Sequence, residues 1–417
     1  MNLVTFDDVK QAIRERKLAV DLDILQLAYE LAKEAHEGQL RSTGEPYIHH
    51  PLATAKTLAE WRLDQPTIIA GILHDVPEDT NVSLEEIHRL FGAEVAKLVQ
   101  GVTKLGRLKY RGLERYSENL RKMFVAMADD VRTVFIKFAD RLHNLSTLQA
   151  LPMVKQQRIA TETLEIYAAI ADRLGMGEIK DQLEDLAFKA LRPEEYQQME
   201  QLLAEQAPKL EQKLLAFQLS LKSLLKENNV SFLELYGRHK HNYSVWKKLT
   251  VKGKQLTQIH DLIALRVIVP SVEDCYQTLA VVHRQWTPVP GRAKDYIARP
   301  KDNGYQSLHT AVFDNDGTVV EIQIRTSEMH EQAEYGIAAH WHYKEKGAKR
   351  ADNKHTAWLQ EIAELQKRLT DDDLLTAAKL ELFKNRIFAL TPHGDVIDLP
   401  DGATIIDFAY HVHTDIG

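Results

Sequence analysis

The chain has 417 residues, with 53 Lys and Arg against 60 Asp and Glu, and a formal net charge of −7. This length predicts two or three domains, and the acidic balance argues against a protein that coats nucleic acid in general. No apolar run is long enough to span a bilayer, and the N-terminus lacks the apolar segment of a signal peptide. The single cysteine, Cys275, cannot form an internal disulfide, which fits a reducing cytoplasm.

Residues 1–195 carry apolar side chains at helical spacing in one segment after another, and strand signals are nearly absent. They predict an all-α domain. Residues 196–230 continue as amphipathic helix and are expected to break at Pro208, because proline removes an amide donor. We interpret them as connecting helices, with ordinary packing helices as the simpler alternative.

From residue 231 the composition changes to short β-branched runs such as ALRVIVP and GTVVEIQIRT, separated by turns and helical segments. This pattern predicts a mixed α/β domain over residues 231–345. A charged helical linker is expected over 346–380, followed by a small β-rich unit over 381–417. That unit is too short for a core of its own, so the chain is expected to be truncated within it.

The first group of polar residues interrupts the apolar helices. The segment RSTGEPYIHHP brings His49 and His50 before a helix, GILHDVPEDT ends a second helix at His74 and Asp75, and FIKFADRLHN places Asp140 near the end of a third. Imidazole and carboxylate without thiolate suit Mn²⁺, Fe²⁺ or Zn²⁺ better than a structural zinc site. Such a metal would hold a phosphate and lower the pKa of a bound water.

Two carboxylates, Glu78 and Asp79, follow the His-Asp pair closely enough to orient that water or accept its proton. The simpler alternative treats the His-Asp pair as a helix cap. It also treats Asp140 as half of a structural ion pair with Arg141.

These three segments together resemble the HD-type hydrolase domain of the RelA/SpoT family of bifunctional (p)ppGpp synthetase/hydrolases. The resemblance implies removal of the 3′-pyrophosphate from (p)ppGpp with Mn²⁺. It implies His50, His74, Asp75 and Asp140 as metal ligands, with His49 the weaker candidate because the family's histidine directly precedes the proline. It further implies Glu78 and Asp79 at the attacking water, and Arg41 and Asn144 near the guanine nucleotide.

A second group lies in the α/β half. The stretch from Tyr236 to Lys254 is basic and has no acidic residue, which suits polyphosphate or a nucleic-acid backbone, or else a solvated basic face. Asp261 is a natural Mg²⁺ ligand at a strand edge, although strict alternation would put Asp261 and Arg266 on opposite faces. In GTVVEIQIRT, Glu321, Gln323 and Arg325 alternate with aliphatic residues and predict a polar face of a strand.

The segments GRHKHNYSVWKK, HDLIALRVIV, RAKDYIARPKDNGYQSLHT and VEIQIRT resemble, in order, the nucleotidyltransferase-like synthetase domain of the same family. The resemblance implies transfer of pyrophosphate from ATP to the 3′-OH of GDP or GTP. Asp261 and Glu321 would be the Mg²⁺ and general-base carboxylates. Arg238 and Lys240 would serve ATP, Tyr305 would stack on guanine, and Lys301 and His309 would lie near its phosphates. The basic RAKD loop is similar to that of bifunctional family members.

The last residues, from TPHGDVIDLP onward, resemble the start of a TGS regulatory domain. Family members continue with further modules that meet the ribosome and tRNA. Two positions depart from the family's pattern: Pro77 replaces an aliphatic residue and could shift Glu78, and Asp172 replaces a histidine.

Three interpretations follow. The first has two opposed enzymes in one chain, with nucleotide in one half disfavouring the other through the 196–230 helices. The second has an active synthetase and a regulatory helical half. The third is a ribosome- or RNA-binding nucleotide sensor, which the basic block favours but the carboxylates and the metal set oppose.

Overall fold

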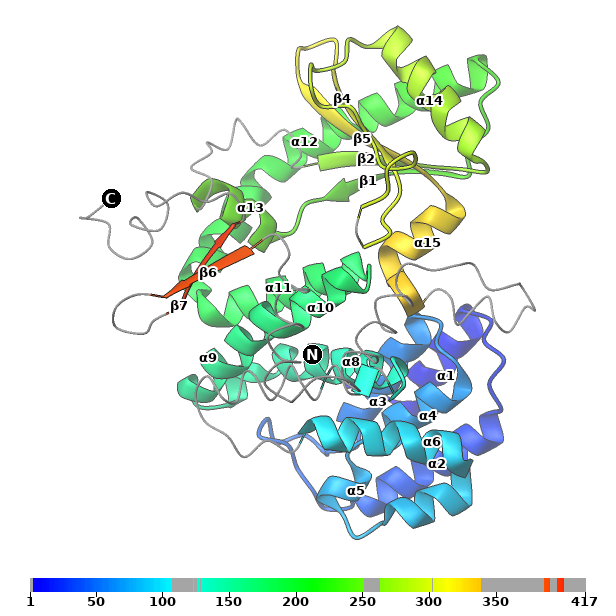
Figure 1. Cartoon of the computed structure of the whole chain (residues 1–417), viewed down its shortest axis with the longest axis vertical. Helices are drawn as coiled ribbons and strands as arrows, with labels where there is room; N and C mark the ends of the chain where they lie inside the picture. Colours follow the sequence, from blue (N-terminus) through cyan, green and yellow to red (C-terminus); the bar gives the residue numbers. More distant parts are fainter. Residues whose placement is uncertain are drawn as a thin grey trace.

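The computed structural model describes residues 3–106, 123, 126–127, 129–250, 263–301 and 303–338, and two strands at 386–390 and 396–400. Helices up to residue 191 form one body, which we call the helical domain. The long helix after it and a five-stranded sheet form a second body, the sheet domain, on the other side of helices α10 and α11 (Figure 1). The expected all-α half and mixed α/β half are confirmed. None of the described helices is long and apolar enough to cross a membrane.

The helical domain is built from these elements: α1 (Phe6–Glu15), α2 (Leu22–Ala35), α3 (His49–Glu60), α4 (Gln65–Leu73), α5 (Val76–Asp79), α6 (Leu84–Gly106), α8 (Arg132–Ser146), a 3-10 turn (Leu148–Ala150), α9 (Met153–Glu162), a π-helical turn (Thr163–Tyr167), α10 (Ala168–Arg173) and α11 (Gly177–Leu191). Local signals set several starts. Thr5 and Asp8 form a capping box at α1, and Asp64 caps α4 just before Pro66.

The sheet domain follows with these elements: α12 (Pro193–Glu227), β1 (Glu234–His239), α13 (Asn242–Thr250), β2 (Ile263–Val269), α14 (Val272–Gln285), β3 (Lys294–Asp295), β4 (Leu308–Phe313), β5 (Val319–Thr326), α15 (Ser327–Tyr335) and a 3-10 turn (Gly336–Ala338). The strands are ordered β1-β2-β5-β4-β3, with only β2 and β5 parallel. Strands β6 (Arg386–Leu390) and β7 (Val396–Pro400) form an antiparallel pair, as the Gly-Asp turn between them predicts.

Close helix contacts hold the helical core together. A Cβ on Gly71 of α4 would lie 2.5 Å from Leu58 Cδ1 of α3, so glycine lets these two helices approach. At the start of α8, the Arg132 guanidinium donates to Asp64, Glu94 and Asp130, which ties α8 to α4 and α6. Helices α3, α4 and α8 are thereby fixed against one another, and these three carry the first candidate site.

Helix α12 does not break at Pro208, and that prediction was wrong. The helix continues to Glu227, and Phe217, Leu221 and Leu225 beyond the proline are buried in the core of the sheet domain. One missing amide costs a single helical hydrogen bond, whereas burial of three large apolar side chains stabilises the distal segment by several kcal/mol (about 1.5–3 each). Its second half therefore packs as part of the sheet domain. The linker expected at 346–380 lies outside the described residues.

The two domains meet at α11 and α15. Gly336, which ends α15 at φ +56°, approaches so closely that a Cβ would lie 2.1 Å from Leu174 O of the helical domain. Beside it, Arg62 of the helical domain donates to Glu331 of α15 at 2.9 Å, and Ala338 is buried in the helical core. Only glycine fits at residue 336 without a shift of one domain against the other.

We expect Gly336→Ala to weaken the docking of the domains, because it adds a backbone clash to a strained φ that alone costs on the order of 1–3 kcal/mol. Thermal and urea unfolding of the chain would measure the loss. Gly317→Ala is the matched control, since Gly317 also has a positive φ (+74°) but has open space where a Cβ would lie. Equal destabilisation by the two variants would show that the close approach to Leu174 adds nothing to the loss of stability.

Candidate functional site

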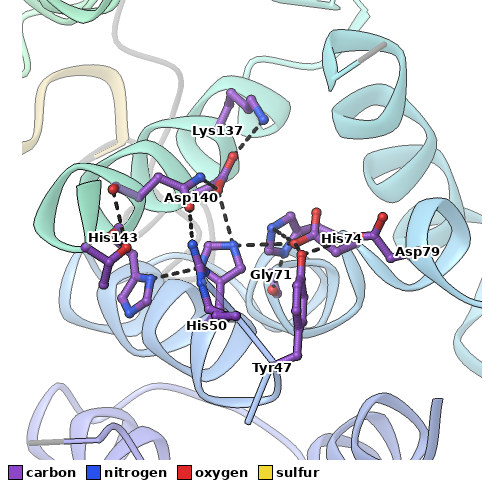
Figure 2. Close-up of polar contacts among 12 residues, drawn as sticks. Tyr47, His50, Gly71, His74, Asp79, Lys137, Asp140 and His143 are labelled. Atoms are coloured by element: carbon purple, nitrogen blue, oxygen red, sulfur yellow. Dashed lines mark hydrogen bonds and ion pairs between the residues drawn. The ribbon is translucent and has the colours of Figure 1, made fainter. Parts of the chain in front are cut away.

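Four side chains converge in the helical domain, from α3, from α8 and from the turn between α4 and α5; His50, His74 and Asp140 are labelled in Figure 2. His50 lies in the first turn of α3, and its Nε2 is 3.4 Å from Asp75 Oδ2 and 3.3 Å from Asp140 Oδ1. His74 Nε2 is 3.2 Å from the same Asp75 oxygen. The structure therefore brings together the two histidines and two aspartates that the sequence singled out. His49 turns away, since its Nδ1 is 2.8 Å from Val4 O.

The observed structure agrees in part with both interpretations of the His-Asp pair, the metal site and the helix cap. His74 is the C-cap residue of α4, and Asp75 is the N-cap residue of α5 but makes no side-chain capping bond there. The His74 Nδ1–H donates to Gly71 O at 2.8 Å, so in the neutral ring the lone pair lies on Nε2. That Nε2 is buried and faces the Asp75 carboxylate at 3.2 Å without a well-aligned hydrogen bond, in a side chain only 1% exposed. A buried ring nitrogen left this way is what a metal ligand requires.

Asp140 lies in the middle of α8 rather than near its end, and is 4% exposed. Its partners are Lys137 Nζ at 2.6 Å and the Asn144 side-chain amide. The expected alternative pair with Arg141 was wrong, because Arg141 turns toward Glu162 at 3.6 Å. Burial raises the pKa of Asp140, but Lys137 and the two histidines outweigh it and hold that pKa well below its usual value. The carboxylate is therefore ionised.

The donor set fits a divalent cation. His50, His74 and Asp140 each offer one ligand atom within 4.8 Å of the others, and the Asp75 oxygen that faces both imidazoles adds a fourth. Burial lowers the pKa of His74, but the Asp75 carboxylate raises it to about 9, so without a cation this ring is protonated. A bound cation would take the place of that proton.

Glu78 and Asp79 stand exposed on the short helix α5 at the mouth of this cluster. Pro77 lies in the first turn of α5, where an amide has no intrahelical partner, so proline removes no helical hydrogen bond there. The sequence reasoning missed Tyr47. Its hydroxyl is 2.9 Å from Asp75 Oδ2 and 3.0 Å from Asp79 Oδ2, and so joins the cluster to the carboxylate at its mouth.

A cavity of about 230 Å³ adjoins the cluster and is lined partly by Arg41 and Asn144, the two residues expected near a nucleotide. Arg41 Nη2 donates to Asn144 Oδ1 at 2.7 Å, and Asn144 in turn donates to Asp140. Arg41 Nη1 is buried without a hydrogen-bond partner. The cavity is thus lined by the Arg41 guanidinium, which has an unused donor. The side chain of Asn144 separates this guanidinium from Asp140 of the His-Asp cluster.

The second site follows from the register of the sheet. His309 of β4 pairs with Gln323 of β5, Gln323 with Arg266 of β2, and Arg266 with Tyr236 of β1. Paired residues lie on the same face, and every second residue shares it. Arg238, Glu321 and Arg325 therefore project from that face too, while Val320, Ile322 and Ile324 point into the core on the other.

One end of this polar face gathers four residues that the sequence singled out. Tyr305 Oη is 2.8 Å from His309 Nε2, and His309 Nδ1 is 3.7 Å from Glu321 Oε1. Lys301 Nζ lies 5.0 Å from the centre of the Tyr305 ring. Burial and the surrounding cations lower the pKa of His309 to about 3, so its ring is neutral.

Two arginines of this polar face, Arg266 and Arg325, are buried. Arg325 is 1% exposed beneath α15, and both Arg325 and Arg266 donate to Glu334 of that helix at 2.7 and 2.9 Å. Arg266 Nη1 also donates to Tyr236 Oη at 3.1 Å. Two guanidiniums that share one carboxylate can be buried because the carboxylate offsets part of their charge.

Arg238, expected to serve ATP, is held by the other domain. Its Nη2 donates to Asp181 Oδ2 of α11 at 2.7 Å, and His241 Nε2 contacts the same oxygen at 2.8 Å. Asp185, one turn further on, accepts the backbone N–H groups of Tyr243 at 2.8 Å and Asn242 at 3.3 Å, and so caps α13 across the domain boundary.

Three other positions were singled out by the sequence. Lys240 lies between β1 and α13, beside this contact. Asp261 lies outside the described residues, so its geometry with Arg266 stays a prediction. Asp172, the second departure, accepts from Lys180 Nζ at 3.0 Å, and its backbone oxygen accepts from Asn303 of the loop that leads to β4. It therefore serves the contact between the domains.

The fold and the sites define a chain with an HD domain followed by a RelA/SpoT region. Family models agree: the HD domain matches residues 28–177, the region found in RelA/SpoT proteins matches 237–348, and the TGS domain matches 387–417. The chain belongs to the RelA/SpoT family.

Three curated relatives show the extent of the similarity. The GTP pyrophosphokinase of Myxococcus xanthus is 47% identical over 403 residues, 95% of this chain and 53% of that protein. The guanosine-3′,5′-bis(diphosphate) 3′-pyrophosphohydrolase of Aquifex aeolicus is 46% identical, over 94% of this chain and 56% of the relative. The bifunctional (p)ppGpp synthase/hydrolase SpoT of Escherichia coli K12 is 44% identical, over 99% and 59%. This chain thus spans little more than half of each.

The contact of His241 with α11 predicts a pH-dependent stability. Burial lowers the pKa of His241, but hydrogen bonds to Asp181 and Asp185 raise it to about 10, above its ordinary 6.5. The protonated ring therefore stabilises the folded chain fully below about pH 6.5, and this contribution disappears as the pH rises through about 10.

We expect His241→Asn to lose on the order of 1 kcal/mol near neutral pH, because the 22% exposed ring is partly screened. Thermal unfolding from pH 6 to about 10 would show the variant and the wild type converging as the pH rises. A difference that stays constant with pH would contradict the assignment.

Proposed function

We propose that this chain is a bifunctional alarmone enzyme. It transfers pyrophosphate from ATP to the 3′-OH of GDP or GTP, and it hydrolyses the 3′-pyrophosphate of (p)ppGpp. The observation that carries the proposal is the convergence of two imidazoles, His50 and His74, and two carboxylates, Asp75 and Asp140, in the helical domain. The names of the relatives, which cover both reactions, support it.

For hydrolysis, the four converging side chains would hold a divalent cation, which we propose is Mn²⁺. When bound, that cation supplies a water of lowered pKa and a positive charge beside the phosphate. Glu78 and Asp79 would orient the attacking water and accept its proton, with Tyr47 fixing Asp79. Arg41 and Asn144 would bind the guanine nucleotide in the adjoining cavity. The water oxygen would bond to the phosphorus attached to the ribose 3′-oxygen, and the bond between that phosphorus and the 3′-oxygen would break. GDP would leave with its 3′-OH restored, and the pyrophosphate would carry the water oxygen.

For synthesis, Glu321 would accept the proton of the ribose 3′-OH as that oxygen attacks the β-phosphorus of ATP, and AMP leaves. Neutral His309 and Lys301 would lie near the phosphates of the acceptor nucleotide, and Tyr305 would stack on its base. Arg238 and Lys240 would serve ATP. Asp261 would hold Mg²⁺, which neutralises phosphate charge. Such catalysis is mainly positioning and electrostatics.

We further propose a cytoplasmic location, from the single buried cysteine and the nucleotide substrates. Ribosome and tRNA contacts are proposed for modules of the kind that extend the longer relatives.

We expect the wild-type chain to release GDP and pyrophosphate from ppGpp with Mn²⁺. His74→Ala and Asp140→Ala should each lose at least about 100-fold in rate, because each removes a metal ligand. Chromatography of the nucleotides would measure this. Both variants should still make ppGpp from ATP and GDP, which serves as the control for folding. Absence of release from ppGpp under any divalent metal would leave only the synthetase interpretation.

The contacts of α11 refine the proposed opposition between the sites. The Asp181 carboxylate forms an ion pair with the Arg238 guanidinium, which would bind ATP. The carboxylate therefore competes with ATP in this conformation. The opposition therefore acts through α11, not only through the 196–230 helices.

We expect Asp181→Asn to raise the synthesis rate at low ATP by up to about fivefold, because it removes a competitor for Arg238. Steady-state rates against ATP concentration would test this. Glu178→Gln is the matched control, since Glu178 lies on the same helix and accepts at 3.1 Å from Gln182, one turn along that helix. An unchanged ATP dependence in Asp181→Asn would remove this contact from the control of the enzyme.

A further inference from the structure

His143 is a half-buried imidazole that none of the roles above uses. It lies on α8 three residues after Asp140, so both side chains project from one face of the helix. Its Nδ1 is 2.9 Å from His50 Nδ1, with ring centres 4.9 Å apart. Figure 2 shows His143 on the side of the His50 ring away from His74.

Helix α8 therefore contacts both ring nitrogens of His50. Asp140 faces Nε2 at 3.3 Å, and His143 faces Nδ1 at 2.9 Å. For Nε2 to bind a cation, its lone pair must be free, so the proton of His50 must lie on Nδ1. That proton needs an acceptor, and the group within hydrogen-bond distance of Nδ1 is the imidazole of His143.

The acceptor role requires His143 to be neutral, with its own proton on Nε2. The other histidine of the cluster uses a different device, because His74 donates its Nδ1–H to a backbone carbonyl. A carbonyl can only accept, whereas an imidazole can exchange donor and acceptor roles.

We infer that His143 is a positioning residue, which accepts the His50 Nδ1–H and so presents the His50 Nε2 lone pair to the metal. This inference rests on the proposed function, since it takes the cluster to be the metal centre. Outer partners of this kind typically contribute 10–100-fold to metal affinity. His143 itself touches neither metal nor substrate.

The test is Mn²⁺ affinity, measured by calorimetric titration of the full chain. His143→Leu removes the acceptor and should weaken Mn²⁺ binding by about 10–100-fold. His143→Asn should retain most of the affinity, because its Oδ1 is attached to Cγ as Nδ1 is and can accept the same proton. His88→Asn, at an exposed position of α6, is the control and should bind as the wild type does.

Each outcome decides something. If the wild type binds no Mn²⁺, the proposed metal centre fails and this inference fails with it. If the wild type binds and His143→Leu binds equally well, the inference alone is overturned. Equal loss in His143→Asn and His143→Leu would assign the effect to packing and also overturn it. If His143→Leu does not fold, as judged by thermal unfolding, the Mn²⁺ affinity of His143→Asn is used instead. A loss of affinity in His143→Asn would then overturn the inference.

Discussion

A buried carboxylate is the constraint on which the helical domain depends. Removing an ionised carboxylate from water costs several kcal/mol unless opposite charge and hydrogen bonds surround it. Asp140 is therefore enclosed by Lys137, the Asn144 amide and the imidazole of His50. These partners come from α3 and α8, so the compensation of one charge fixes how two helices lie against each other. The close approach at Gly71 then brings in α4 with His74.

This enclosure also makes the cluster suitable for a cation. With His74 neutral, its Nε2 and the two carboxylates leave more acceptors than donors at the centre. Tyr47 contributes one hydroxyl proton, and burial together with Asp75 and Asp79 raises its pKa, so it stays a donor. At moderate pH, a proton on His74 supplies a donor for the acceptors that remain. A divalent cation would replace this proton and would bring twice its charge.

Much of the fold could be predicted because its signals are local. Apolar spacing marks the helices of residues 1–195, and alternation marks β2 and β5. The residues of the metal cluster could be chosen because motifs place them at polar interruptions of apolar helices. Contacts between residues far apart in the sequence could not be predicted. Arg238 and Asp181 lie 57 positions apart, and nothing in the sequence around either residue indicates that they pair. Burial of Arg325 depends on α15 folding back over the sheet, which strand alternation alone cannot show.

The free energy of each contact between the domains limits how strongly that contact can couple the two sites. Arg238 is 32% exposed in its pair with Asp181, so that ion pair alone is worth about 1 kcal/mol or less. A polyphosphate, with several charges, could displace it easily. Two other contacts are less easily exchanged. The close packing of Gly336 on Leu174 leaves no room for a side chain, and the capping of α13 by Asp185 pairs two backbone N–H groups that are costly to leave unpaired. The proposed control of one site by the other would therefore require the α11 and α15 interface to shift as a whole, and the Asp181 contact would be the part that responds to the ligand.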